Sequence, residues 1–520
     1  MKETSRPGGS KAGFKDAFLS VIRRAPVVTR ADGRARKLLP QAFLVALMLA
    51  LAFPAALVVA PGFINPEPPA APATPAWQLP PATLSARQGL APVPVNAPVP
   101  LPSAVTAQLD SVLTPDGEGS FTGLVQDALT GDVLFDRGGS ENRVPASNMK
   151  LFTAAAALRV LGPDHRFSTK AVAGATANQV VLTGGGDVLL GAGESAPGQV
   201  MGHAGLATLA ADTVAALQAR GTTGELTVLV DDSLFSGPAL NPAWADGDVA
   251  AGEVAPLSPL ALNSARYNPA VTTGPRPQDP AVTAADAFAA QLKAAGAAVG
   301  HTVAAGVRRS PGSQPPGAVA IAPETASPGP GAVLAEVKSA TVGDQVGLML
   351  ESSDNYLAEV LGRMAAAASG EPASNDGATA AVRAQVGELG IPTGSMRFAD
   401  VAGLAIGNQV TAGQLAEVVR AITTGTDPRL RTALDGFPVA GLTGTLDSRY
   451  EDAATARGAG LVRAKTGTLN TVTALSGYVV DADGRLLVFS FIGNGLKPGA
   501  AGNREAVDRA AAALAACGCR

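Results

Sequence analysis

Regular patterns of apolar and polar residues begin only after a proline-rich stretch, and they predict strands at both ends of the remaining chain. Residues 121–137 contain two alternating runs around a Thr-Gly-Asp turn, which is typical of a β-hairpin. Apolar residues with helical spacing start at Ser147 and return from Val342 through residues 411–425. Residues 459–516 predict a strand, a second hairpin and a closing helix.

The residues between these elements have a different texture and predict an inserted domain. Residues 168–336 combine short β runs with many Gly and Pro and one helical stretch at 284–298. Early and late strands can share one antiparallel sheet only if the middle of the chain leaves this sheet and returns. We therefore expect an α+β fold, in which residues 104–167 and 337–520 form an antiparallel sheet flanked by helices and residues 168–336 form a large inserted β-rich domain.

The N-terminal part of the chain is typical of a membrane anchor. Residues 38–64 contain no charged side chain, and about 20 apolar residues suffice for a transmembrane helix. Residues 1–37 carry ten Lys and Arg against three Asp and Glu, which predicts a cytoplasmic tail and a single-pass cell-membrane protein with an extracytoplasmic body. Residues 65–103 then form a Pro/Ala-rich linker. Cleavage as a signal peptide is the alternative, and it is disfavoured because Pro61 follows the small-residue site.

Ser147 and Lys150 lie three positions apart at the start of the first helical run. The ordinary interpretation is a helix N-cap followed by a solvated lysine. Residues i and i+3 of a helix are neighbours, however, so the lysine amine can reach the serine hydroxyl. A serine becomes a nucleophile when a base takes its proton, and a lysine can be that base if burial or a second cation lowers its pKa toward neutrality. The positive field of a helix N-terminus disfavours a charged lysine and thereby favours the neutral amine.

A second candidate is the sequence Ser353-Asp354-Asn355, between two helical runs. These three residue types are preferred helix N-caps, so simple capping of the following helix is the alternative interpretation. A short polar turn between helices can also point a hydroxyl and an amide into a cleft. In that case Ser353 would pass on a proton and Asn355 would bind an amide group of a substrate.

A third candidate is Lys465-Thr466-Gly467-Thr468, in a predicted strand. The alternative here is an exposed lysine followed by a glycine bulge. As a functional site, the glycine would let an extended substrate lie along the strand edge, while Lys465 and Thr466 bind a carboxylate. The backbone N–H of Thr468 would then contribute to an oxyanion hole.

Histidines and cysteines add little to these candidates. The three histidines, His165, His203 and His301, lie outside the second and third motifs, which argues against a Ser-His-Asp triad. The only cysteines, Cys517 and Cys519, are too few for a structural zinc site and too close together for an easy disulfide.

Two short patterns suggest ligand sites but are better explained as turns. The glycine-rich residues 184–187 lack the Lys-Ser/Thr pair of a phosphate-binding loop. Asp231 and Asp232 are adjacent in a predicted strand, where neighbouring side chains point to opposite faces, so they do not form a glycosidase carboxylate pair. We predict a turn at the end of a strand.

The order S-x-x-K, S-D-N, K-T-G is the motif set of serine β-lactamases and penicillin-binding proteins. The chain resembles the low-molecular-mass, class C penicillin-binding proteins of the D-alanyl-D-alanine carboxypeptidase/endopeptidase type, peptidase family S13, in an actinobacterial form. The resemblance extends from about Val105 to the C-terminus and includes VVLTGGGDVLL, VDDSLFSGPALNPAW and FPVAGLTGTLDSRY. It implies a penicillin-binding protein/serine β-lactamase-like transpeptidase fold.

The resemblance also implies roles for the residues of the three motifs. Ser147 would be the acylated nucleophile, Lys150 its base, and Ser353 a catalytic proton shuttle. The backbone N–H groups of Ser147 and Thr468 would form the oxyanion hole. The residues that hold the substrate and its terminal carboxylate would be Asn355, Lys465, Thr466, Gly467 and Thr468.

The implied function is a serine D-alanyl-D-alanine carboxypeptidase or DD-endopeptidase that acts on peptidoglycan stem peptides through an acyl-enzyme, with β-lactams as covalent inhibitors. No cofactor, metal ion or nucleic acid is expected, and the basic tail is interpreted as a topology determinant. A serine β-lactamase, which shares the motifs, is one alternative. The other alternative is a catalytically silent envelope-binding scaffold. It is motivated by the segment Asp400–Ala405, which reads DVAGLA where many relatives read DGSGLS and so lacks two hydroxyls.

Overall fold

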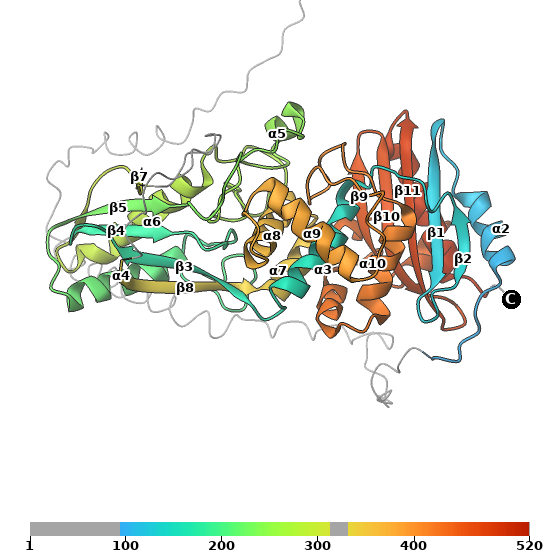
Figure 1. Ribbon diagram of the computed structural model, residues 1–520, viewed down its shortest axis with the longest axis horizontal. Helices are drawn as coiled ribbons and strands as arrows, with labels where there is room; N and C mark the ends of the chain where they lie inside the picture. Colours follow the sequence, from blue (N-terminus) through green and yellow to red (C-terminus); the bar gives the residue numbers. More distant parts are fainter. Residues whose placement is uncertain (1–93, 312–330, 519–520) are drawn as a thin grey trace, which may run out of the picture. The chain divides into compact units, whose positions relative to one another are not determined.

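The computed structural model describes residues 94–311 and 331–518 (Figure 1). The predicted tail at 1–37, the predicted membrane span at 38–64 and most of the predicted linker lie outside these residues. Among the helices of the described ranges, none has both the length and the apolar composition that a membrane span requires.

A five-stranded antiparallel sheet contains strands from the early and the late part of the chain, in the order β2-β1-β11-β10-β9. β1 pairs with β11 along most of its length, and the two predicted hairpins are β1–β2 and β10–β11. The expectation of an α+β fold with one shared antiparallel sheet is therefore confirmed. The strands are β1 (Glu118–Asp127), β2 (Val133–Arg137), β9 (Arg463–Leu469), β10 (Val472–Val480) and β11 (Leu486–Lys497).

Helices cover both faces of this sheet (Figure 1). Phe489 and Phe491 of β11 pack in a core with α2 and α11, whereas Val488 and Ile492 of the same strand belong to the core that includes α3, α8 and α10. Burial on both faces explains why β11 is a nearly continuous apolar run rather than a strict alternation. The helices are α2 (Pro102–Val112), α3 (Lys150–Val160), α7 (Val342–Ser352), α8 (Asn355–Ala368), α9 (Asn375–Glu388), α10 (Ala412–Thr424) and α11 (Ala500–Ala515).

Residues from the middle of the chain form a second, mixed sheet in the order β6-β5-β4-β3-β8, with β7 paired to β5. β3 is antiparallel to β4 and β8, whereas β5 is parallel to β4 and β6. α4 and α6 pack with this sheet around a separate apolar core. The sequence places the end of the insertion between residues 336 and 337, and both of these residues lie within the single strand β8. The elements are β3 (Arg166–Ala173), β4 (Gln179–Thr183), α4 (Leu206–Ala219), β5 (Glu225–Asp231), α5 (Asp246–Ala251), α6 (Pro280–Ala297), β6 (Thr302–Val303), β7 (Arg308–Arg309) and β8 (Val333–Thr341).

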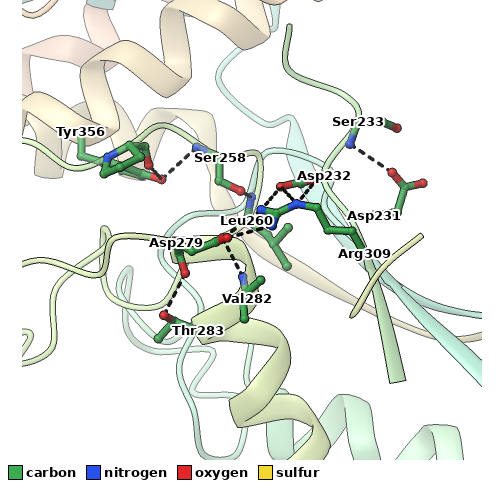
Figure 2. Close-up of polar contacts among 11 residues, drawn as sticks. Asp231, Asp232, Ser233, Ser258, Leu260, Asp279, Val282, Thr283, Arg309 and Tyr356 are labelled. Carbon is green, nitrogen blue, oxygen red and sulfur yellow. Dashed lines mark hydrogen bonds and ion pairs between the residues drawn. The ribbon is translucent and has the colours of Figure 1, made fainter. Parts of the chain in front are cut away.

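An ion-pair cluster ties the elements of the second sheet together (Figure 2). The guanidinium of Arg309 on β7 lies 2.8 Å from Asp232, directly after β5, and 2.8 Å from Asp279. Asp279 also accepts a backbone N–H as the N-cap of α6. Asp231 accepts the backbone N–H of Ser233 at 3.0 Å. The two adjacent aspartates thus belong to a structural turn and an ion pair at the end of a strand.

Cys517 follows α11 and is buried in the same core as that helix. It is disulfide-bonded, so the expectation that it would not pair easily was wrong. Cys517 lies beyond the last helical residue, where regular backbone geometry does not restrict the direction of the side chain.

Candidate active site

The first motif lies where a short 3-10 turn, Ala146–Met149, leads into α3. The sequence predicts that the α-helix opens at Ser147, but Ser147 lies inside the 3-10 turn and α3 begins at Lys150. Ala146 has a positive φ of 48°, an unfavourable conformation for a residue with a Cβ, directly before the serine. Lys150 Nζ lies 3.0 Å from Ser147 Oγ, so the predicted contact between amine and hydroxyl is present.

Lys150 is fully buried, which excludes the solvated lysine of the ordinary interpretation. Its Nζ donates to Asn355 Oδ1 and to the carbonyl of Ala402, both at 2.7 Å. Burial lowers the pKa of Lys150 to about 8, against the opposing effect of Asp400 and other carboxylates. Desolvation is therefore the main cause that favours the neutral amine, which is one of the causes expected from the sequence.

The second motif separates α7 from α8. Ser353 is the C-cap of α7 and has a left-handed backbone with φ 59°, Asp354 is the N-cap of α8, and Asn355 is the first residue of α8. Asp354 accepts the backbone N–H of Leu357 at 3.0 Å, so the capping interpretation is correct for Asp354. Since this one residue caps the helix, the side chains of Ser353 and Asn355 are left to face a cavity.

Contacts from the segment after α5 hold the start of α8. Asn355 Nδ2 donates to the carbonyl of Glu253 at 3.1 Å, while Asn355 Oδ1 accepts from Lys150. The buried hydroxyl of Tyr356 accepts the backbone N–H of Ser258 at 3.0 Å (Figure 2). Both ends of the Asn355 amide thus have protein partners, and the second N–H of its amide nitrogen is the group available to a substrate.

The third motif lies on β9, at an edge of the antiparallel sheet. Lys465 is fully buried, which excludes the exposed lysine of the alternative interpretation. Its Nζ donates to Ser353 Oγ at 2.9 Å and to the carbonyl of Thr466 at 2.7 Å. The hydroxyls of Thr466 and Thr445 share a hydrogen bond of 2.7 Å. Burial and the charge of Lys150 hold the pKa of Lys465 well below its usual value.

Gly467 permits a close approach between β9 and the turn that carries Ser147. β9 pairs with β10 without a register shift, so the glycine bulge of the alternative interpretation is absent from this strand pair. A Cβ at Gly467 would lie 2.7 Å from the carbonyl oxygen of Pro145 and 3.2 Å from the backbone nitrogen of Ser147. Any larger residue would therefore push the serine away from the third motif. Thr468, the next residue, is exposed at the cavity.

The segment Asp400–Ala405 forms a turn beside the first motif. The buried carboxylate of Asp400 accepts the backbone N–H groups of Gly403 and Ala405, each at 2.7 Å. Gly403 has φ +84°, and a Cβ there would lie 2.0 Å from the carbonyl oxygen of Ala146. A buried carboxylate therefore holds this turn without hydroxyl side chains in residues 401–405.

A cavity of about 1240 Å³ connects the three motifs. Ser147, Ser353, Asn355, Thr466 and Thr468 line it. None of the three histidines, all of which are in the described part of the chain, lines this cavity. Sequence reasoning assigned no role to several lining residues, of which only Thr445 and Arg449 lie in a stretch that resembles the family. These are Glu253, Arg266, Arg276, Thr445, Arg449 and Arg504.

The sequence matches the profile of the D-Ala-D-Ala carboxypeptidase 3 (S13) family over residues 105–313 and 272–516. The chain belongs to this family. It is 36% identical over 442 residues to carboxypeptidase DacB of Mycolicibacterium smegmatis, covering 85% of this chain and 89% of that protein. It is 30% identical over 451 residues to the D-alanyl-D-alanine carboxypeptidase of an Actinomadura species, covering 74% of this chain and 80% of that protein.

The fold of this S13 chain is similar to the crystal structure of penicillin binding protein 4 from Haemophilus influenzae, with a TM-score of 0.58 and 22% identity. The similarity covers 78% of this chain and 98% of that one, and it concerns the fold. The penicillin-binding protein/β-lactamase-like architecture expected from the motifs is therefore confirmed. Family membership also confirms the predicted activity, that of a serine-type D-Ala-D-Ala carboxypeptidase.

Proposed function

We propose that Ser147 is the nucleophile of this S13 carboxypeptidase and that Lys150 is its general base. The observation that carries the proposal is the 3.0 Å contact between Lys150 Nζ and Ser147 Oγ at a fully buried lysine. The neutral amine takes the hydroxyl proton while Oγ attacks the carbonyl carbon of the penultimate D-alanine. The backbone N–H groups of Ser147 and Thr468 stabilise the oxyanion that forms.

We propose that Ser353 returns this proton to the leaving group. The C–N bond of the tetrahedral intermediate breaks, and the terminal D-alanine leaves as an amine that takes the proton through the Ser353 hydroxyl. The 2.9 Å hydrogen bond from Lys465 holds that hydroxyl in place. A water molecule then attacks the serine ester with Lys150 again as the base, which releases the shortened peptide and restores Ser147.

The remaining motif residues are proposed to bind the end of the substrate. Hydroxyls of Thr466 and Thr468, beside the Lys465 amine, suit a terminal carboxylate because hydrogen bonds to an ionised acceptor are strong. The free amide N–H of Asn355 suits a substrate carbonyl. Gly467 keeps these groups close to the serine.

Covalent labelling tests the proposal. In a β-lactam the carbonyl resembles the scissile amide, but the ring nitrogen stays tethered after attack, so penicillins are proposed as covalent inhibitors. Purified protein mixed with a labelled penicillin should give a persistent adduct that maps to Ser147 by peptide mass spectrometry. S147A should abolish both the adduct and the release of D-alanine from a cell-wall pentapeptide. S111A, a change at an exposed serine of α2, should leave both intact.

Two other outcomes would overturn the proposal. Rapid hydrolysis of the penicillin without a lasting adduct would indicate a serine β-lactamase. Absence of both adduct and D-alanine release would indicate a silent envelope-binding scaffold of the same fold.

We further propose that residues 38–64 anchor the enzyme in the cell membrane, with the active site outside the cytoplasm. The proposal is supported by the uncharged run and by the cluster of positive residues before it. An alkaline phosphatase fusion at the C-terminus should be active, and the protein should stay with membranes after alkaline carbonate washing. Release into the soluble fraction as a shortened chain would show instead that the segment is cleaved.

A further inference from the structure

Glu359 is a fully buried acid that the three motifs do not account for. It lies on α8 four residues after Asn355, so the two side chains lie on the same side of the helix. Glutamate is almost never fully buried unless a partner compensates for the loss of water.

The partners of Glu359 are in the Asp400–Ala405 turn. Glu359 Oε1 accepts the backbone N–H of Val401 at 2.9 Å and that of Ala402 at 2.8 Å. Within the described part of the chain, Glu359 Oε2 has no hydrogen-bond partner. One carboxylate oxygen that accepts two successive N–H groups restricts the backbone of both residues.

The next group in this chain of contacts is the general base. The carbonyl oxygen of Ala402 accepts a hydrogen bond from Lys150 Nζ at 2.7 Å. Ala402 therefore binds Glu359 through its N–H and Lys150 through its carbonyl. The conformation of a single residue connects the acid on α8 to the amine on α3.

We propose that Glu359 is a positioning residue of the reaction, which holds the Ala402 carbonyl against Lys150 and acts with its charge on the protonation of that amine. The inference rests on the proposed role of Lys150. A backbone carbonyl accepts a hydrogen bond from both the charged and the neutral lysine amine. The fixed position of the Ala402 carbonyl orients the neutral amine so that its lone pair points toward Ser147. A loosened turn would let the amine rotate away from the serine.

The charged groups around Glu359 and Lys150 determine in which direction Glu359 shifts the pKa of Lys150. Asp400 in the turn raises the pKa of Glu359, and Arg363 on α8 lowers it. The charged form of Lys150 is favoured by four carboxylates, those of Asp400, Asp354, Glu359 and Glu253. A positive charge on Lys150 lowers the pKa of Lys465 on β9. Burial, reinforced by Asp400, raises the pKa of Glu359 to about 8. Glu359 is therefore half protonated near pH 8, where Lys150 also titrates, and it raises the pKa of Lys150 only to the extent that it is charged. Removing the carboxylate lets the amine lose its proton at a somewhat lower pH.

Two variants of the full-length protein separate these effects, with the penicillin acylation rate measured as a function of pH. E359Q keeps an acceptor for the two N–H groups but cannot be charged. Its plateau rate should stay close to that of the wild type, and its acidic limb should move toward lower pH near pH 8, where Glu359 of the wild type carries charge. E359A removes the acceptor, and its plateau rate should fall about 100-fold while the non-covalent affinity for penicillin changes little.

Asp187 provides a matched control, because it is also a buried acid but accepts the backbone N–H of Leu189 instead of groups in the turn. D187N should leave both the plateau and the acidic limb unchanged. An E359Q profile that coincides with the wild-type profile would overturn the inference, as would a full plateau rate in E359A. If E359A does not fold, E359Q alone decides. Failure of the wild type to form an adduct at Ser147 would overturn the proposed function itself, and this inference with it.

Discussion

The guanidinium of Arg266 lies 2.8 Å from the carboxylate of Asp354, and both side chains are almost fully buried. Arg266 belongs to the segment between α5 and α6, whereas Asp354 is the middle residue of the second motif and the N-cap of α8. Residues inserted between the first and second motifs thus hold the turn that carries Ser353 and Asn355.

This ion pair predicts a large effect for R266M. The change leaves the Asp354 carboxylate buried without its partner, which should destabilise the protein by about 3–5 kcal/mol in urea unfolding and slow penicillin acylation. The control is R509A, which removes a partly exposed pair with Glu505 one helical turn away and should cost about 0.3–0.5 kcal/mol. Equal unfolding curves for the two variants would contradict the prediction.

The buried amine of Lys150 predicts the pH dependence of acylation. Burial lowers the pKa of Lys150 to about 8, and only the neutral amine accepts the Ser147 proton. The acylation rate should therefore be highest above about pH 8 and fall about tenfold per pH unit below it. K150R should be inactive throughout, because a guanidinium stays charged. Stopped-flow measurement with a fluorescent penicillin checks the profile, and a rate independent of pH below neutrality would exclude Lys150 as the base.

Gly403 and Gly162 form a matched pair of glycines. Both have a left-handed backbone, with φ +84° and +86°, but a Cβ at Gly162 would meet no atom within 4 Å, whereas one at Gly403 would lie 2.0 Å from the Ala146 carbonyl oxygen. G162A should cost only the backbone strain of about 1–2 kcal/mol. G403A should destabilise the protein further and lower acylation about 100-fold, because the clash displaces the residue before Ser147. Comparable acylation rates in the two variants would refute this account.

A buried chain of hydrogen bonds anchors the serine turn to the central strands. Asn148 Nδ2 donates to Ser476 Oγ at 2.7 Å, and Ser476 Oγ donates to Ser490 Oγ at 2.8 Å, with all three residues fully buried. N148A should cost about 1–3 kcal/mol, since it leaves a buried hydroxyl short of a partner. In a double-mutant cycle with S476A, the two changes should couple by at least about 0.5 kcal/mol. Strictly additive free energies of unfolding would show that the hydrogen bond contributes nothing.

The sequence by itself determined the features that depend on near neighbours in the chain. The contact between Ser147 and Lys150 follows from their spacing along one turn, and the capping role of Asp354 follows from its position at a helix start. The two hairpins and the shared antiparallel sheet follow from apolar alternation at both ends of the described region. The motif order was sufficient for the family, because each motif carries side chains of a distinctive type.

Only the tertiary structure decided which distant groups act on these residues. The Ala402 carbonyl has no residue-type signal, the partners of Glu359 come from another segment, and Gly467 is required by the backbone at Pro145 rather than by its own strand. The burial of Lys150, which lowers its pKa, likewise results from helices and strands that meet only in the fold. Hydrogen bonds and desolvation act through space over a few ångströms, whereas sequence patterns report on neighbours within one turn or one strand.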